Sequence, residues 1–374
     1  MLIGDFLFGY KDYCPRTLFF TLVPQPLDTP GCIAIAPRNG ANQAHTHLFA
    51  MIVLYIVQTF KDLAHIRRLV KVMQESDPSG VVIITHNSEA FQLSPNDFPE
   101  CSNLYIINRE TGSRLDFSLV QAYLDALDYA RHQGINFDWV INLTGQCYPA
   151  RPLRELVNLL EAADVDGFID HRLIFDDDGK GGGIWPYYEA HNRYHYLYHW
   201  RLTRSELAWL WRQVFGLVRV ALHAIQPWLR LDTSYALQIG WLDTSGTVGK
   251  DFPLFGGSWY MTLSRRAADY LWKFSQSHPE IKAHFSLMNT PSEVYPHTVL
   301  TNNPDLKLNG HQHFFFDVRL SKRGRPLILG MEDLDRIQAS GMFFARKFNP
   351  NIDSEVLDRL DEQVLGSTTD SMPR

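Results

Sequence analysis

The chain has 374 residues, which is enough for one large α/β domain or for two coupled ones. Apolar residues make up 45% of it and charged residues 20%, as in ordinary soluble globular enzymes. Its net charge of −6 argues against a general nucleic-acid binder, because neutralising phosphates needs a surplus of basic side chains.

The cysteine content and the lack of targeting patterns indicate the cellular compartment in which the protein works. The four cysteines are scattered and show neither a disulfide framework nor C-x-x-C zinc spacing. The longest apolar run, 48–57, has about half of the ~20 residues that a membrane-spanning helix needs, and the N-terminus does not read as a signal peptide. We therefore predict a cytoplasmic protein that works in solution or in peripheral contact with the inner face of a membrane.

The chain divides by pattern into three parts. Residues 1–50 are interrupted by five prolines and show no clean period, so we expect an irregular N-terminal extension. One domain follows over 51–365, in which 51–165 is the nucleotide-binding half and 166–365 the acceptor and catalytic half. Residues 366–374 are polar and are expected to form a disordered tail.

Apolar runs alternate with helical patterns in the first half of this domain. The runs span 52–57, 81–84, 104–107 and 139–143, and the helical stripes span 63–73, 119–130 and 152–160. This alternation predicts an α/β fold with a mostly parallel sheet flanked by helices. Ligands of such sheets bind at the carboxyl ends of the strands, so we expect a site near 85–87 and 144–147.

The second half departs from the alternation. Residues 202–239 are rich in tryptophan and predict a mostly helical insertion on the acceptor side. The aromatic and polar residues at 187–200 fit either the core of this insertion or a platform for an acceptor sugar. A last helix is predicted over 353–365, with Val356, Leu357, Leu360 and Val364 on one side.

Four short motifs carry the candidate chemistry. They are NLTGQCYP at 142–149, FGGSWYMTLSR at 255–265, PSE at 291–293 and FFARKF at 343–348. Glu293 is a carboxylate at a helix start, and Arg346 and Lys347 are adjacent cations inside an apolar frame. A carboxylate and buried cations suit a reaction that deprotonates a hydroxyl group and releases an anionic leaving group, such as sugar transfer from a nucleoside diphosphate.

The ordered set of motifs resembles the Core-2/I-branching glycosyltransferases, glycosyltransferase family 14. That family includes β-1,6-N-acetylglucosaminyltransferases and peptide O-xylosyltransferases. The resemblance covers residues ~52–365. It implies a GT-A-type fold and an inverting, metal-independent transfer from a UDP-sugar, with N-acetylglucosamine favoured over xylose, to a hydroxyl group of a glycan or protein.

The resemblance also implies roles for single residues. Glu293 matches the general base, and the cations matched to the donor diphosphate are Lys347, Arg325, its alternative Arg323, and Arg346. The expected nucleotide contacts are Val57, Gln58, His86, Gly145 and Gln146. The expected acceptor contacts are Trp259, Tyr260, Cys147 and Tyr148. On an extended segment side chains alternate, so only one of Arg346 and Lys347 should face the ligand.

Departures from the family pattern keep a second hypothesis open. Ser292, Cys147 and His86 stand where the family has aspartates. A catalytically silent protein that binds glycans or UDP-sugars on the same fold is therefore the alternative. A glycoside hydrolase ranks third, because it needs two facing carboxylates and the motifs supply only Glu293.

We expect no metal ion and no cofactor. The run Asp176, Asp177, Asp178 superficially matches the D-x-D metal motif of other GT-A enzymes, but it precedes a glycine-rich turn and does not end a strand. His311 and His313 lack a third partner in the sequence and are read as ordinary strand histidines.

Overall fold

The computed structural model describes residues 32–34, 51–110, 116–175, 185–202, 208–233, 237–317 and 326–366. All of them belong to one compact unit, Cys32–Arg374. Apart from the short strand β1 (Cys32–Ala34), the predicted extension lies outside the described residues, and so does the predicted tail after Gly366.

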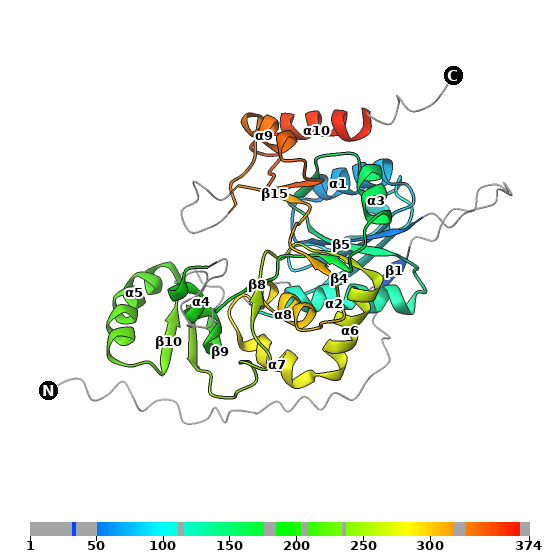
Figure 1. The fold of residues 1–374 in the computed structure, drawn as a ribbon. Helices are drawn as coiled ribbons and strands as arrows, with labels where there is room; N and C mark the ends of the chain where they lie inside the picture. Colours follow the sequence, from blue (N-terminus) through cyan, green and yellow to red (C-terminus); the bar gives the residue numbers. More distant parts are fainter. Residues whose placement is uncertain are drawn as a thin grey trace, which may run out of the picture. The chain divides into compact units, whose positions relative to one another are not determined.

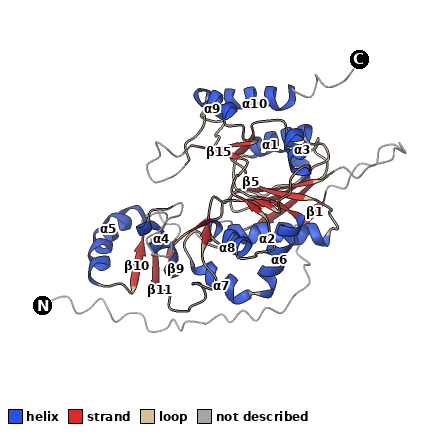
Figure 2. Ribbon diagram, viewed as in Figure 1, coloured by secondary structure: helices blue, strands red, loops and turns tan. Residues whose placement is uncertain are grey.

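The centre of the fold is an eight-stranded sheet with the order β1-β4-β3-β2-β5-β13-β7-β14 (Figures 1 and 2). The strands not yet bounded are β2 (Val53–Thr59), β3 (Val81–Asn87), β4 (Leu104–Arg109), β5 (Trp139–Thr144), β7 (Gly167–Phe168), β13 (Thr262–Ser264) and β14 (Leu308–Asn309). Strands β4, β3, β2 and β5 are parallel, which confirms the predicted parallel sheet. Strand β13 runs antiparallel between β5 and β7.

Helices cover both faces of this sheet (Figure 1). One face packs against α1 (Leu63–Ser76), α3 (Leu153–Glu161) and α10 (Glu355–Gly366). The other packs against α2 (Ser118–His132), α6 (Arg265–Ser277), α7 (Pro279–Leu287) and α8 (Tyr295–Thr301). Every β2 side chain is buried, because alternate residues enter the two cores. The fold is therefore a mixed α/β structure of three layers.

The last helix is held by packing and by charge. All four apolar side chains predicted for its inner face are fully buried in α10. Arg68 of α1 pairs with Asp358 and Asp361 of α10 at 2.6 Å each. The Tyr148 hydroxyl donates to Asp361 at 2.6 Å and accepts from Arg68 at 3.1 Å. This network ties the C-terminal helix to the strand that follows β5.

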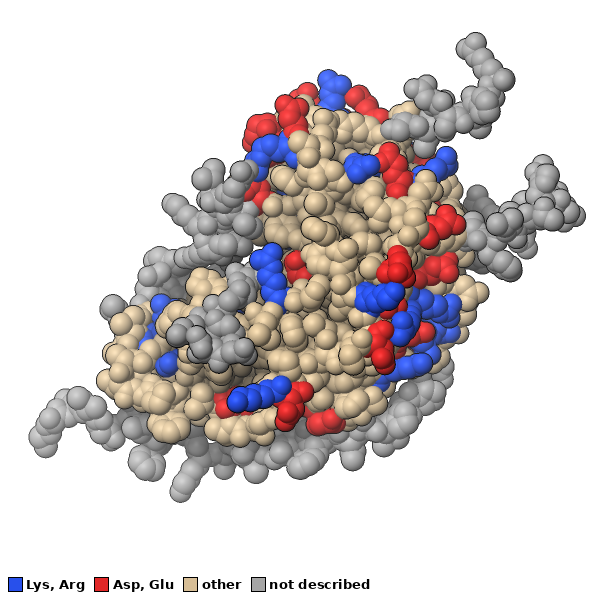
Figure 3. Space-filling model, in the orientation of Figure 1, with Lys and Arg blue, Asp and Glu red and all other residues tan. Residues whose placement is uncertain are grey.

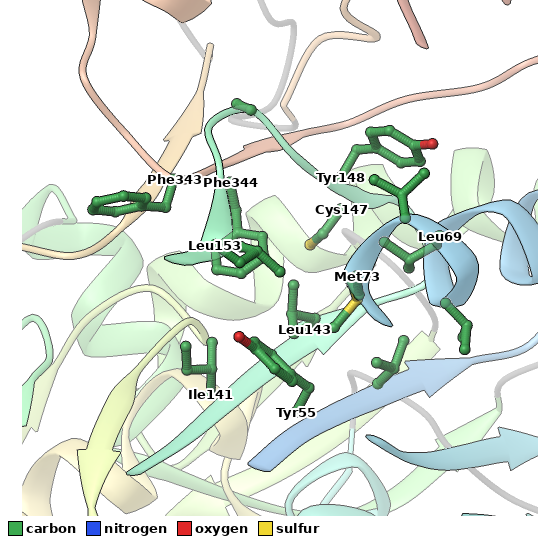
Figure 4. Packing of buried hydrophobic residues seen from close by; sticks show 14 of the residues in the cluster. Tyr55, Leu69, Met73, Ile141, Leu143, Cys147, Tyr148, Leu153, Phe343 and Phe344 are labelled. Atoms are coloured by element: carbon green, nitrogen blue, oxygen red, sulfur yellow. The ribbon is translucent and has the colours of Figure 1, made fainter. Parts of the chain in front are cut away.

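A small sheet joins two of the motifs. Strands β6 (Cys147–Pro149), β16 (Phe344–Arg346) and β15 (Phe314–Phe316) pair in the order β15-β16-β6, with Arg346 opposite Cys147. Cys147, Tyr148 and Phe344 pack among core side chains that include Leu153 (Figure 4). The motif at 343–348 is thereby fixed beside the carboxyl end of β5.

The predicted helical insertion contains the long helix α5, but it also contains a small sheet that the sequence did not indicate. Helix α4 (Tyr187–Tyr194) and helix α5 (Ala208–Ile225) accompany a three-stranded antiparallel sheet, β10-β11-β9, built from β9 (Tyr196–Leu202), β10 (Leu229–Asp232) and β11 (Leu237–Leu242). Tyr196 and Tyr198 are buried in β9. Long-range pairing decides the conformation of such short aromatic runs, and a helical period read from the sequence does not report it.

The remaining described elements are short. They are β8 (Arg172–Leu173), paired with β12 (Phe255–Gly256), then α9 (Leu334–Ala339) and the 3₁₀ turns η1 (Pro95–Asp97), η2 (Pro291–Glu293) and η3 (Met331–Asp333). Within the described part of the chain, every helix is too short or too polar to cross a bilayer. On the face drawn in Figure 3, basic side chains lie next to acidic ones.

Candidate functional site

A cleft of about 1180 Å³ opens at the carboxyl ends of the parallel strands. Gln58 and Thr59 end β2, His86 lies near the end of β3, and Thr144 ends β5; all four line the cleft. This is the edge of the sheet at which the sequence places a ligand. The far wall comes from the insertion, through α4, α5 and β10.

The cleft collects about half of the predicted site residues. Those that line it are Gln58, His86, Gln146, Trp259, Tyr260, Glu293 and Arg346. Gly145 lines a small adjoining pocket. Arg323 and Arg325 lie outside the described residues. Lys347 is half-buried and lies outside the set of cleft-lining residues, so Arg346 is the described member of the cation pair that borders the cleft.

Three predicted contacts lie in the core instead. Val57, Cys147 and Tyr148 are 0% exposed. The Tyr148 hydroxyl is held by Asp361 and Arg68, on the side of α1 and α10, and Figure 4 shows Cys147 among core side chains. Their predicted roles as nucleotide or acceptor contacts would need the core to open, so the structure favours structural roles for these three residues.

Close packing places Glu293 at the rim of the cleft. It ends the turn η2, its N–H donates to the Thr290 carbonyl at 3.0 Å, and its carbonyl accepts from the Gly257 N–H at 3.0 Å. A Cβ atom added to Gly257 would meet the Asp170 Cβ at 2.2 Å and the His297 Cε1 at 2.7 Å. Only glycine at position 257 leaves room for the Asp170 and His297 side chains. The helix after Glu293 is short and has Pro296 in its first turn.

A cation that the motifs did not reveal holds the Glu293 carboxylate. Arg193 of α4 donates to Glu293 Oε2 at 2.9 Å, and the same guanidinium pairs with Glu189. The Cζ atom of Arg193 lies 5.2 Å from the centre of the Trp185 ring. Burial lowers the pKa of Arg193, but Tyr194, Glu293 and Glu189 outweigh it and leave the pKa raised. The arginine therefore stays charged and fixes the carboxylate in place.

Arg346 is the cation best placed to meet a bound anion. Its guanidinium lies 4.7 Å from the centre of the Tyr260 ring, which orients it at the cleft wall. Its Nε atom is buried and has no hydrogen-bond partner among the described residues. A buried donor left without a partner is costly, and an anion in the cleft would supply an acceptor for this side chain.

His86 is occupied by the protein itself. Its Nε2 atom lies 2.9 Å from the Phe91 carbonyl, which can only accept, so Nε2 carries the proton. Burial lowers the pKa of His86, so the neutral Nδ1 accepts from the Thr59 hydroxyl at 2.7 Å. Both ring nitrogens are thus engaged. A hydrogen bond from either of them to the base of a nucleotide would replace one of these two bonds.

Trp259 and Gln58 both line the cleft and are hydrogen-bonded to each other. The Trp259 Nε1 donates to Gln58 Oε1 at 2.6 Å, and Gln58 Nε2 donates to the Leu119 carbonyl at 2.8 Å. Asn142 of β5 donates to the Trp259 carbonyl at 2.7 Å and accepts from the Met261 N–H at 2.8 Å. The asparagine that opens the motif at 142–149 therefore locks the motif at 255–265 onto the sheet.

The cleft holds more carboxylates than the one that the motifs supply. Asp170, Glu189 and Asp232 line the cleft together with Glu293. Each of the three is engaged: Asp170 accepts from the Ser258 N–H at 3.2 Å, Glu189 pairs with Arg193, and Asp232 accepts from Asn289. The motifs missed them because they lie in the insertion and loops, where no local pattern marks a site.

The aromatic cluster of the insertion has buried members and an exposed one. Tyr194, Tyr196 and Tyr198 are buried, whereas Tyr188 is 62% exposed and lines the cleft. Core packing therefore accounts for the inner members, and the outer one is available to a ligand.

The described residues contain no group of three or more His, Cys, Asp or Glu side chains arranged to hold a metal ion. Asp176, Asp177 and Asp178 lie outside them. His313 is buried, lies 3.1 Å from the Thr262 hydroxyl, and has a pKa lowered to about 4 by burial, whereas His311 is exposed.

Comparison with known proteins points to one family. Residues 53–215 match the model of the family Core-2/I-Branching enzyme. The chain is similar to Beta-glucuronosyltransferase GlcAT14A of Arabidopsis thaliana, at 25% identity over 253 residues, which are 66% of this chain and 47% of the relative. It is equally similar to GlcAT14B of the same plant, at 25% identity over 66% of this chain and 49% of the relative. The chain spans about half the length of these curated relatives.

Solved structures resemble the chain only remotely. A 4-diphosphocytidyl-2C-methyl-D-erythritol synthase from Anaerococcus prevotii aligns with 78% of this chain and 98% of its own, at 10% identity and a TM-score of 0.33. A putative glucose-1-phosphate thymidylyltransferase from Bacillus anthracis aligns with 77% of this chain and 95% of its own, at 8% identity and a TM-score of 0.30.

Proposed function

We propose that this chain is a glycosyltransferase of the Core-2/I-branching type that moves a sugar from a UDP-sugar to a hydroxyl group of a glycan or protein. Its residues 53–215 match the model of that family. The observation that carries the proposal is one shared cleft. A carboxylate, Glu293, and a cation without a hydrogen-bond partner at Nε among the described residues, Arg346, both line it at the carboxyl ends of the parallel strands.

In the proposed reaction Glu293 is the general base. It takes the proton of the acceptor hydroxyl while that oxygen attacks the anomeric carbon of the donor. The bond between the anomeric carbon and the diphosphate oxygen breaks, and UDP leaves with the electron pair. One displacement at one carbon inverts its configuration. Arg193 supports this role because its ion pair with Glu293 orients the carboxylate.

Fixed cations are proposed to stabilise the departing diphosphate, so that no metal ion is required. Preorganised charges in a cleft stabilise developing negative charge without reorganisation during the reaction. Arg346 borders the cleft, and Lys347 follows it directly. Arg325, or Arg323 in its place, completes the proposed set from outside the described residues.

Three sugars are candidates for the group that the UDP-sugar donor carries. The motifs favour N-acetylglucosamine over xylose, and the similarity to two proteins named as glucuronosyltransferases adds glucuronic acid. We propose N-acetylglucosamine as the first donor to test. A uronic acid would bring an additional negative charge, which Arg172 at the cleft is suited to receive.

The test is a panel of UDP-sugars incubated with the full chain, with UDP release as the readout and a chelator in a parallel series. Release from one donor, undiminished by the chelator, is the expected result. A large fall in rate with the chelator would refute the metal-independent mechanism. Tight UDP binding without release from any donor, with or without glycan acceptors, would support the silent binding protein instead.

A further inference from the structure

The cleft extends well beyond the strand ends. Its volume of about 1180 Å³ is above the range of about 300–1,000 Å³ that is usual for small-molecule sites. Helices α4 and α5 and strand β10, which stand together in Figure 1, line an outer part of it that the proposed reaction does not use. We call this part the distal arm and define it by Tyr188, Asn192, His223, Asp232 and Thr233.

A series of contacts links the distal arm to the proposed base. The Glu293 carboxylate pairs with Arg193 at 2.9 Å, and the Asn289 N–H donates to the Arg193 carbonyl at 3.3 Å. The Asn289 side chain donates in turn to the carboxylate of Asp232 on β10. All four of these residues line the cleft. A ligand that meets Glu293 with one end can therefore continue along the same wall into the distal arm.

Asn192 brings an unsatisfied hydrogen-bonding atom to the distal arm. Its Oδ1 atom is buried and makes no hydrogen bond to any described residue. Asn192 follows Tyr188 by four positions on α4, so the two side chains lie on one face of the helix. A buried polar atom without a partner is costly, and a hydroxyl group bound in the arm would donate to this oxygen.

Tyr188 offers an aromatic face that is held in position. Its side chain is 62% exposed, and its hydroxyl oxygen lies 3.5 Å from Nδ1 of His223 on α5. His223 Nε2 accepts from the Leu231 N–H at 3.1 Å, so the ring proton is on Nδ1, towards Tyr188. Burial, together with Arg230 and Arg219, lowers the pKa of His223 to about 4, so the ring is neutral at pH 7. The tyrosine ring is thereby fixed at its oxygen and open on its face.

We propose that the distal arm binds the second and further sugar units of an oligosaccharide acceptor, whose first unit presents its hydroxyl group to Glu293. A sugar ring has an apolar face and a rim of hydroxyl donors. The ring of Tyr188 and the oxygens of Asn192 and Asp232 match these two features. This inference rests on the proposed transferase function, which leaves glycan and protein acceptors open, and it selects a glycan.

The experiment measures how transfer depends on acceptor length. The acceptors are glucose, galactose and N-acetylglucosamine, each with its β-linked di- and tetrasaccharide. We expect kcat/KM in at least one series to be about fivefold or more higher for the tetrasaccharide than for the monosaccharide. Tyr188→Ala should bring this ratio close to one. Tyr187→Ala is the matched control, because the neighbouring tyrosine is 44% exposed and lies outside the set of cleft-lining residues.

Calorimetry with the same saccharides separates this inference from the proposed function. Binding that strengthens with length and is weakened by Tyr188→Ala and Asn192→Ala, without UDP release from any donor, supports the distal arm and refutes the transferase. UDP release with equal kcat/KM for short and long saccharides, or with transfer only to a serine-containing peptide, overturns the distal arm alone. A length dependence that survives in both variants also overturns it, and the absence of both binding and UDP release overturns both proposals. Thermal unfolding of each variant checks that it is folded.

Discussion

Arg193 and Glu293 form an ion pair at 2.9 Å although 100 residues separate them in the chain. The two side chains are only 11% and 13% exposed. Each charge is therefore largely removed from water and depends on the other for compensation. The helix that supplies Arg193, α4, belongs to the insertion, so this element positions the proposed base.

Removal of Arg193 should slow transfer. In Arg193→Met the carboxylate of Glu293 loses the partner that fixes its position. We expect kcat at pH 7 to fall at least about tenfold. Glu189→Gln is the control: it leaves the Arg193–Glu293 pair intact and should preserve kcat. An unchanged kcat in Arg193→Met would show that the pair has no part in the reaction.

Calorimetry can show which of the adjacent cations Arg346 and Lys347 contributes more to UDP binding. Arg346→Met should weaken UDP binding by about tenfold, because a charge-assisted hydrogen bond to the diphosphate is lost. Lys347→Met should also weaken it, but less, since Arg346 is the one that borders the cleft. The reverse order would mean that the motif resemblance predicts the diphosphate contact better than the described geometry does.

The variant Tyr148→Phe tests whether this buried motif residue contributes to stability or to acceptor binding. Tyr148→Phe removes the hydrogen bonds to Asp361 and Arg68. We expect a loss of about 1–2 kcal/mol in the free energy of unfolding, measured in urea, with unchanged kcat/KM. Tyr260→Phe is the matched change in the cleft, where the hydroxyl lies 3.3 Å from Thr144. A raised KM for the acceptor in Tyr148→Phe would instead support the predicted role of Tyr148 as an acceptor contact.

His313 makes stability depend on pH. Its folded pKa of about 4 is below the ordinary value of 6.5, so the unfolded chain binds a proton more readily between these values. Its contribution is complete above pH 6.5 and is lost as the pH falls towards 4, where the change amounts to about 3 kcal/mol. His313→Gln should flatten the fall in unfolding free energy over this window. The exposed His311→Gln should leave it unchanged, and equal slopes in the two variants would contradict the burial argument.

The first half of the fold could be predicted from the sequence because its pattern is local. Apolar runs gave strands β2 to β5, and the helical stripes gave α1, α2 and α3 within a few residues of their ends. Val356, Leu357, Leu360 and Val364 identified α10 in the same way, and all four are fully buried. The three-stranded sheet of the insertion was missed, since β9 pairs with β11, whose partner residues lie 35 to 46 positions further along the chain.

The candidate site was only partly accessible to sequence reasoning. Glu293 and the cation pair stand in short motifs, and spacing along the chain was enough to select them. Arg193 stands among aromatic residues without such a motif, and only the packing of α4 against η2 brings it to Glu293. Tyr148 shows the opposite error: it belongs to a motif, but the chain turns its side chain into the core.

Glu293→Gln is the measurement that tests the central claim most directly. The amide keeps the shape of the side chain and its contact with Arg193 but cannot accept the proton, so transfer to an acceptor should fall by about 10²- to 10⁴-fold. UDP affinity, measured by calorimetry on the same variant, should stay within about twofold of the wild type. Transfer at the wild-type rate in Glu293→Gln would contradict the account, because the cleft would then hold a different base.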